Sequence, residues 1–204
     1  MSDNQNANQR RSESTRLRRE LIVNTAIECF ADKGFHQTSI RDIAQRAKVS
    51  LGNLYNYFDS KEALILEIAQ VEAEDLIKFE KILADRNAPL MTIERFVNAY
   101  LKEVTQPLYT ALAIDIAAEA MRNKEVAASF QANRIRISKA LIDLLSEGIE
   151  SKVFDPNLDC AAVAALFLDA IEGLGFSLAL QGKKVSKKSG KDLLWNLQKI
   201  VRTI

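Results

Sequence analysis

The chain contains few residues that break helices, with only 7 Gly and 3 Pro among its 204 residues. β-Sandwiches and barrels need many tight turns, and tight turns depend on these two residue types. Their scarcity therefore predicts long, uninterrupted elements and an all-α fold. Hydrophobic residues make up 48% of the chain and charged residues 27%, a balance that allows a true core and argues against global disorder.

Apolar residues recur at helical spacing along most of the sequence. Local signals mark helix ends near the N-terminus: Gly34 fits a C-cap, Ser39 and Asp42 have capping-box spacing, and Ser50 fits an N-cap. The predicted helices, about nine in all, cover residues 15–33, about 39–47, 51–58, 61–86, 92–103, 107–121, 125–152, 159–180 and 191–203.

The composition changes near residue 60. It predicts a small helical module over residues 15–60 and a larger helical bundle over 61–204, after a polar, disordered tail at 1–14. No apolar run reaches the ~18 residues that a membrane span needs, and the first residues lack the apolar stretch of a signal peptide. We therefore expect a cytoplasmic protein without membrane contact.

Few residues suit metal or nucleophile chemistry. The chain has one His and two Cys; Cys29 and Cys160 are too few for a disulfide framework, and we expect buried structural thiols. There is no Glu-x-x-His pair, no His-Glu-x-x-His motif and no carboxylate pair with a His partner. We expect no metal, no cofactor and no enzymatic activity.

The most informative segment is 38–58, where a turn of about three residues joins two short helices that a preceding helix braces. This pattern is typical of a helix-turn-helix, whose second helix enters the DNA major groove. Gly52 would let the backbone approach the duplex closely, and Asn53 suits the edge of adenine. Residues 1–61 also hold ten Lys and Arg against seven Asp and Glu, a basic excess that suits phosphates.

The stretch from Gly34 to Leu64 reads GFHQTSIRDIAQRAKVSLGNLYNYFDSKEAL. It resembles the TetR (tetracycline-repressor-like) family of bacterial transcription regulators at around a dozen positions, and the strong resemblance covers roughly residues 16–76. The resemblance implies base or groove contacts at Arg41, Leu51, Gly52, Asn53 and Asn56. It implies contacts to the phosphate backbone at Thr38, Ser39, Tyr55, Tyr57 and Lys61. We add Lys48 and Ser50, from the turn and the cap, to the predicted DNA-binding residues.

Several residues near the motif have more than one interpretation. Family members usually have Gly where this chain has Lys48; a positive φ there would cost roughly 1 kcal/mol, or the side chain would contact phosphate. Leu51 cannot hydrogen-bond a base but can cover a thymine methyl. His36 fits an exposed loop residue or a phosphate contact. Arg16, Arg18 and Arg19 are either solvated or in contact with DNA.

The resemblance also gives the larger bundle two roles. Its middle helices would enclose a small-molecule effector, in a pocket lined by Met91, Phe96, Tyr100, Tyr109, Ile114, Met121 and Phe130, although each of these also fits a core. Its last helices would form a homodimer, with an interface at Val163, Phe167, Ile171, Leu174, Leu178, Leu194 and Trp195.

The mid-helix glycines Gly173 and Gly175 indicate a close helix crossing. We expect a dimeric repressor released from a palindromic double-stranded DNA operator by an effector; an activator, or a regulator controlled by a protein partner, is the alternative.

Overall fold

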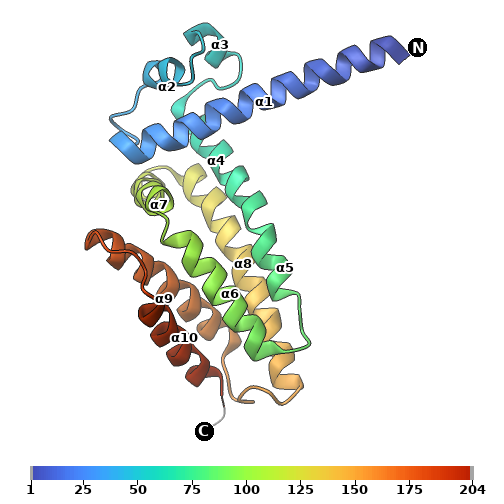
Figure 1. Cartoon of the computed structure of the whole chain (residues 1–204), viewed down its shortest axis with the longest axis vertical. Helices are drawn as coiled ribbons and strands as arrows, with labels where there is room; N and C mark the ends of the chain where they lie inside the picture. The colour runs from blue at the N-terminus through green and yellow to red at the C-terminus, as the bar shows by residue number, and fades with distance from the viewer. Residues whose placement is uncertain (1, 203–204) are drawn as a thin grey trace. The chain divides into compact units, whose positions relative to one another are not determined.

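The computed structural model describes residues 2–202, with side chains from residue 9 onwards except at 187. The described chain forms ten helices and no strand, which confirms the all-α class (Figure 1). It divides into two compact units, one formed by residues up to 70 with 111–127, the other by 71–110 and the residues from 128 onwards.

Each unit is formed by two separate segments of the chain. The first unit holds α1 (Ser2–Lys33), α2 (Ile40–Arg46), α3 (Leu51–Tyr55), the beginning of α4 (Lys61–Asp75), most of α7 (Pro107–Ala120) and the start of α8 (Lys124–Glu150). The second unit holds the end of α4, α5 (Ile77–Leu83), α6 (Pro89–Val104), the start of α7, most of α8, α9 (Cys160–Leu180) and α10 (Lys187–Val201).

In the first unit, apolar side chains from α1 to α4 form one core. The chain turns sharply where α1 ends. Gly34 follows α1 with a φ of 83°, and its amide donates to the carbonyl of Phe30 at 2.8 Å, which confirms the predicted C-cap. Phe35 then packs edge-on against Phe30, with ring centroids 5.2 Å apart. The fully buried residues of this core include Ile22, Phe30, Ile43, Leu54, Leu64 and Ile65.

In the second unit, a larger core is built around an aromatic cluster. Phe79 of α5 packs edge-on against Phe96 and Tyr100 of α6, while these two stack with centroids 5.5 Å apart. A Cβ at Gly175 would lie 2.9 Å from the carbonyl oxygen of Val104, so the predicted close crossing exists between α9 and the end of α6. Gly173 has open space beside it and does not contribute to that crossing.

Several predicted boundaries differ from the structure. Residues 2–14 are part of α1 where the sequence predicts a disordered tail; residues 9–18 are exposed, and Arg16 pairs with Glu20 on the same helix at 2.5 Å. The helix predicted over 61–86 is interrupted at Leu76, whose carbonyl accepts a tight bond from the Phe79 amide at 2.9 Å.

Two helix starts and one helix end also move. Pro89 begins α6, three residues before the predicted start at residue 92, because a first-turn position needs no amide donor. α10 begins before the predicted residue 191, where Ser186 caps it through the amide of Ser189. α3 ends at Tyr55, before the predicted residue 58.

α9 is long and apolar enough, by length and composition, to cross a membrane, with a mean hydropathy of 1.8. This differs from the prediction that no segment qualifies. The helix also carries Asp169 and Glu172, whose carboxylates accept hydrogen bonds from Arg134 of α8 at 2.5 and 2.6 Å. Core helices of soluble proteins meet the same criterion, so α9 is weak evidence for a membrane.

Candidate nucleic-acid interface

The turn between α2 and α3 contains a non-glycine residue in the left-handed region. Lys48 has a φ of 55°, and the amide of Val49 donates back to the carbonyl of Ala44 at 3.0 Å. The turn therefore keeps its conformation with Lys in place of Gly, at a cost of roughly 1 kcal/mol. The Lys48 side chain is exposed and free to reach a phosphate as well.

α3 is anchored on one side and uncovered on the other. Leu54 and Phe58 are buried in the core, and the Ser50 hydroxyl accepts a hydrogen bond from the Asn53 amide at 3.1 Å, which confirms the predicted N-cap. A Cβ at Gly52 would meet nothing within 4 Å. The outward residues are Leu51, Gly52, Tyr55 and Asn56, which are exposed, and Asn53, which is half-buried.

An ion pair between α1 and α4 supports the end of the helix-turn-helix. Arg19 of α1 donates from Nε and Nη2 to the two carboxylate oxygens of Glu67, both at 2.6 Å, and its guanidinium lies 4.5 Å above the Phe58 ring. It also donates to the carbonyl of Tyr57 at 3.4 Å. The hydrogen bonds that Arg19 donates to Glu67 raise the pKa of Arg19. Arg19 therefore has a structural role.

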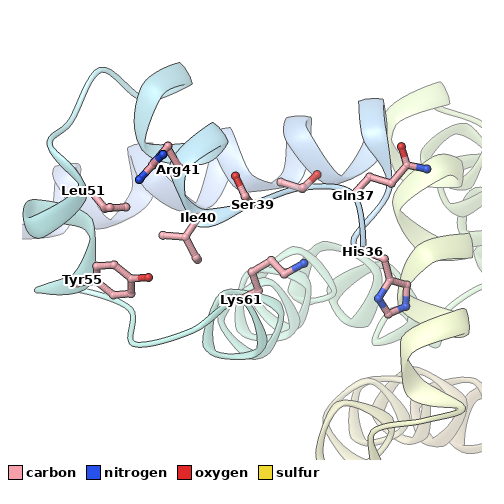
Figure 2. A pocket seen from close by; sticks show the side chains of 9 residues that line it. His36, Gln37, Ser39, Ile40, Arg41, Leu51, Tyr55 and Lys61 are labelled. Carbon is pink, nitrogen blue, oxygen red and sulfur yellow. The ribbon is translucent and has the colours of Figure 1, made fainter.

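An open groove of about 460 Å³ lies beside α3 (Figure 2). It is lined by His36, Gln37, Thr38, Ser39, Ile40, Arg41, Leu51, Tyr55 and Lys61. None of these nine residues is acidic, whereas Arg41 and Lys61 are cationic. A lining that contains amide, hydroxyl and cationic donors and no acidic residue suits a phosphate backbone.

Three of the predicted phosphate contacts already have partners within the chain. Thr38 is 1% exposed, and its hydroxyl donates to the carbonyls of Cys29 and Gly34, so a structural role replaces the predicted phosphate contact. Ser39 is exposed but caps α2, and the Lys61 ammonium donates to the carbonyl of Phe35 at 2.7 Å. Because an ammonium has three donors, Lys61 keeps two for a phosphate.

The predicted capping box at the start of α2 is present. The Asp42 amide donates to the Ser39 hydroxyl at 3.1 Å, and the Ser39 amide donates to Asp42 Oδ2 at 2.9 Å. The hydrogen bond from the Ser39 hydroxyl is the main cause that lowers the pKa of Asp42 to about 2. The box fixes the helix that carries Arg41 along the groove.

Sequence reasoning missed part of the groove. His36, Gln37 and Ile40 line the groove. Of these three, only His36 had a predicted role, as either an exposed loop residue or a phosphate contact. Gln37 precedes the capping box and Ile40 lies within it, and no motif marks either residue. Their position immediately before and inside the first turn of α2 was the available signal.

The predicted effector-pocket residues do not form one lining. Met91, Ile114 and Met121 are exposed, with Met121 89% exposed, because they lie on the solvent side of α6 and α7 or in the turn after α7. Ile114 and Met121 also belong to the first unit. Phe96 is fully buried in the aromatic core, and Phe130 is half-buried.

Tyr100 and Tyr109 instead belong to a polar cluster in the second unit. The Tyr100 hydroxyl donates to Glu172 at 2.8 Å, a side-chain hydrogen bond links Tyr109 to Tyr100, and Asn133 donates to Glu72 at 2.8 Å. Burial raises the pKa of both tyrosines and of Glu72. Such polar groups in an apolar bundle are typical of a ligand site.

Most predicted dimer residues are part of the chain's own core. Val163, Phe167, Ile171, Leu178 and Leu194 are buried within the second unit, because their face of each helix packs on neighbouring helices. Leu174 is half-buried and Trp195 is exposed. The uncovered stripe of α9 is formed by Leu166, Asp169, Gly173, Phe176 and Leu180.

The capped α2, the strained turn and the uncovered α3 define a helix-turn-helix protein. Residues 22–68 match the family described as "Bacterial regulatory proteins, tetR family", and residues 89–196 match "BetI-type transcriptional repressor, C-terminal". The chain belongs to the TetR family and is a DNA-binding transcriptional regulator.

Individual relatives agree with this assignment. The HTH-type transcriptional regulator UidR of Escherichia coli K12 is 30% identical over 171 residues, which cover 81% of this chain and 82% of UidR. The structure of Salmonella enterica GusR matches 90% of this chain and 95% of its own, with a TM-score of 0.74 and 25% identity. Bacillus subtilis FadR in complex with stearoyl-CoA has a TM-score of 0.79 over 90% of this chain and 99% of its own; at 17% identity it shows the fold alone.

Proposed function

We propose that the chain is a cytoplasmic, dimeric repressor whose two α3 helices lie in the major groove of a palindromic operator. One observation carries the proposal: the outward face of α3 is uncovered beside a groove whose lining contains Arg41 and Lys61 and no acidic residue. Residues 15–60 would hold the DNA contacts, and 61–204 the effector and dimer contacts.

The side chains of the groove and of the outward face of α3 divide into two proposed roles. Arg41, Asn53 and Asn56 would contact base edges, with Leu51 against a thymine methyl and Gly52 at the closest backbone approach. Tyr55, Lys48 and Lys61 would contact phosphates, together with Gln37 and the exposed edge of Tyr57. Ser39 and Ser50 would act by fixing the two helices.

A footprint on the region upstream of the chain's own gene tests the proposal. We expect protection of a palindrome, with an affinity that falls steeply as salt rises, because cationic side chains displace counterions from DNA. Protection should disappear when either half of the palindrome is scrambled. Absence of a footprint, or an affinity that salt does not change, would contradict the proposal.

For release from DNA, we propose an effector that bonds to the polar cluster of Tyr100, Tyr109, Glu72 and Glu172. Glu172 already accepts hydrogen bonds from Tyr100 and Arg134, and Glu72 accepts one from Asn133. The remaining acceptor positions of the two carboxylates favour a ligand with hydroxyl or amine donors. FadR of Bacillus subtilis, by contrast, was solved with stearoyl-CoA. Such an effector lowers operator affinity by no more than its preference for the DNA-free state.

Substitutions in this cluster test the effector site separately from DNA binding. Tyr109→Phe keeps the ring and removes the hydroxyl, so the variant should bind operator like wild type. Reporter expression should then lose its response to the inducer found by screening hydroxylated and amine compounds. Full induction of the Tyr109→Phe variant would contradict this placement of the effector.

A further inference from the structure

A buried carboxylate of α7 faces the turn that precedes α2. The Glu119 side chain is 10% exposed, and its Oε2 has no hydrogen-bond partner within residues 2–202. His36 Nε2 lies 3.5 Å from this oxygen. Both residues belong to the first unit. A buried carboxylate oxygen without a donor is costly, so this position favours an N–H on the imidazole.

His36 also belongs to the groove. Figure 2 shows it at the end of the groove opposite Leu51 and Tyr55, next to Gln37. Its ring packs edge-on against Phe35, with centroids 5.5 Å apart, which holds the imidazole between the groove and α7. A proton on His36 would therefore satisfy Glu119 and add positive charge to the groove.

Other charged groups around His36 oppose or favour that proton. Arg122, in the turn after α7, places Nη1 3.4 Å from Nε2; because a guanidinium only donates, this contact requires an unprotonated Nε2, and a proton there exchanges it for the bond to Glu119. Lys61 of α4 and Arg41 of α2 line the same groove. On α7, Asp115 lies beside Gly34 and adds a second acid to Glu119. The cations repel an imidazolium, but Arg122 is exposed and screened, whereas Glu119 is buried, where charge interacts more strongly.

DNA would change this balance. A phosphate in the groove neutralises Arg41 and Lys61 and adds negative charge near the imidazole, so the complex favours the proton more than the free protein does. Imidazole is the ordinary side chain that gains a proton between about pH 5 and 8. His36 is the one histidine of the chain.

We propose that operator binding is coupled to protonation of His36, with Glu119 as the positioning residue that accepts the new N–H. The proton comes from solvent and bonds to an imidazole nitrogen, and it leaves when DNA dissociates. The coupling rests on the DNA contacts proposed above. Operator affinity should therefore rise as pH falls, with a slope of at most one proton per subunit, or two per dimer.

Operator titrations at constant ionic strength, at about pH 6 and about pH 8, test the coupling. Wild type should bind several-fold more tightly at the lower pH. His36→Gln should still bind, with less than about a twofold difference between the two pH values. His36→Lys carries a permanent cation and should bind at the higher pH about as tightly as wild type does at the lower pH.

Glu119→Gln tests the positioning role. It should shift the pH at which affinity changes downwards, because a neutral amide favours the imidazolium less than a carboxylate does. Calorimetry in two buffers of different ionisation enthalpy should show proton uptake by wild type and none by His36→Gln. Thermal unfolding should show that all three variants fold.

Two outcomes would overturn the coupling. A pH profile that is flat in wild type, or unchanged in His36→Gln, would leave the function proposed above in place and remove the role of His36. Failure of wild type to bind any duplex at either pH would overturn that function and the coupling together.

Discussion

The Ser50 hydroxyl accepts a hydrogen bond from the backbone amide of Asn53 at 3.1 Å, which joins the cap of α3 to a proposed base-reading residue. Ser50→Ala should remove this bond and cost about 0.5–2 kcal/mol of stability. Operator affinity should fall as well, because α3 is only one turn and a half long and depends on its cap. Thermal unfolding and operator titration measure the two effects.

Ser186 offers a matched control for this prediction, since its hydroxyl caps α10 through the amide of Ser189 at 3.0 Å. Ser186→Ala should cost a similar amount of stability and leave operator affinity close to that of wild type. Equal losses of affinity in the two variants would show that destabilisation, rather than the position of α3, is responsible.

Asp42 should make the first unit sensitive to acid. Its pKa is lowered from 3.8 to about 2, chiefly by the hydrogen bond from the Ser39 hydroxyl. A lowered pKa in the folded state gives stability that is present above the unfolded value of 3.8 and is lost as pH falls towards about 2. Asp42→Asn should be less stable at neutral pH and show less change across this range in acid unfolding followed by circular dichroism.

Lys48 should limit stability while helping DNA binding. Its φ of 55° favours glycine, so Lys48→Gly should raise the free energy of unfolding by roughly 1 kcal/mol. If the side chain contacts phosphate, the same variant should bind all duplexes more weakly and lower the salt slope by about one for each subunit. A stabilised variant with unchanged DNA affinity would show that Lys48 strains the turn and does not contact phosphate.

Lys152 has the same backbone conformation, with a φ of 60°, in the turn after α8. Lys152→Gly should therefore stabilise the chain to a similar extent. It also removes one positive charge, so it controls for the change in net charge. Its affinity for operator and for random DNA should stay near that of wild type.

The features that the sequence predicted correctly are those that depend on residues close together in the chain. The caps at Gly34, Ser39 and Ser50 each depend on a partner within four residues, and all three are present. The apolar periodicity of α9 showed that the helix has a broad apolar face. It could not show that Phe167 packs inside the chain while Leu180 stays 71% exposed, because that depends on distant helices.

The sequence also did not reveal the long-range contacts within the candidate interface. His36 and Glu119 are far apart in the sequence, and no spacing rule connects them. Thr38 matched a phosphate-contact position of the family, yet its hydroxyl turns inward to the carbonyl of Cys29. Resemblance gave the position of each residue in the motif but not the direction of its side chain.

The uncovered stripe of α9 should form the dimer contact. Leu180→Glu places a charge on an exposed position, so the monomer should fold normally while the dimer dissociates. Sedimentation should show a monomer, and operator affinity should fall by about 100-fold or more, because two linked α3 helices bind far better than one. Ile135→Glu, an exposed apolar position on α8, should leave the dimer intact.

Operator titration of Gly52→Asp tests the central claim most directly. The side chain meets open space on α3, and an acid in the first turn of a helix is favourable, so folding should be unaffected. Gln131→Glu makes the same charge change on exposed α8 and serves as the control. The account predicts that Gly52→Asp loses about 100-fold or more in affinity while Gln131→Glu binds like wild type. Equal, near-wild-type binding by both variants would show that α3 does not face the DNA.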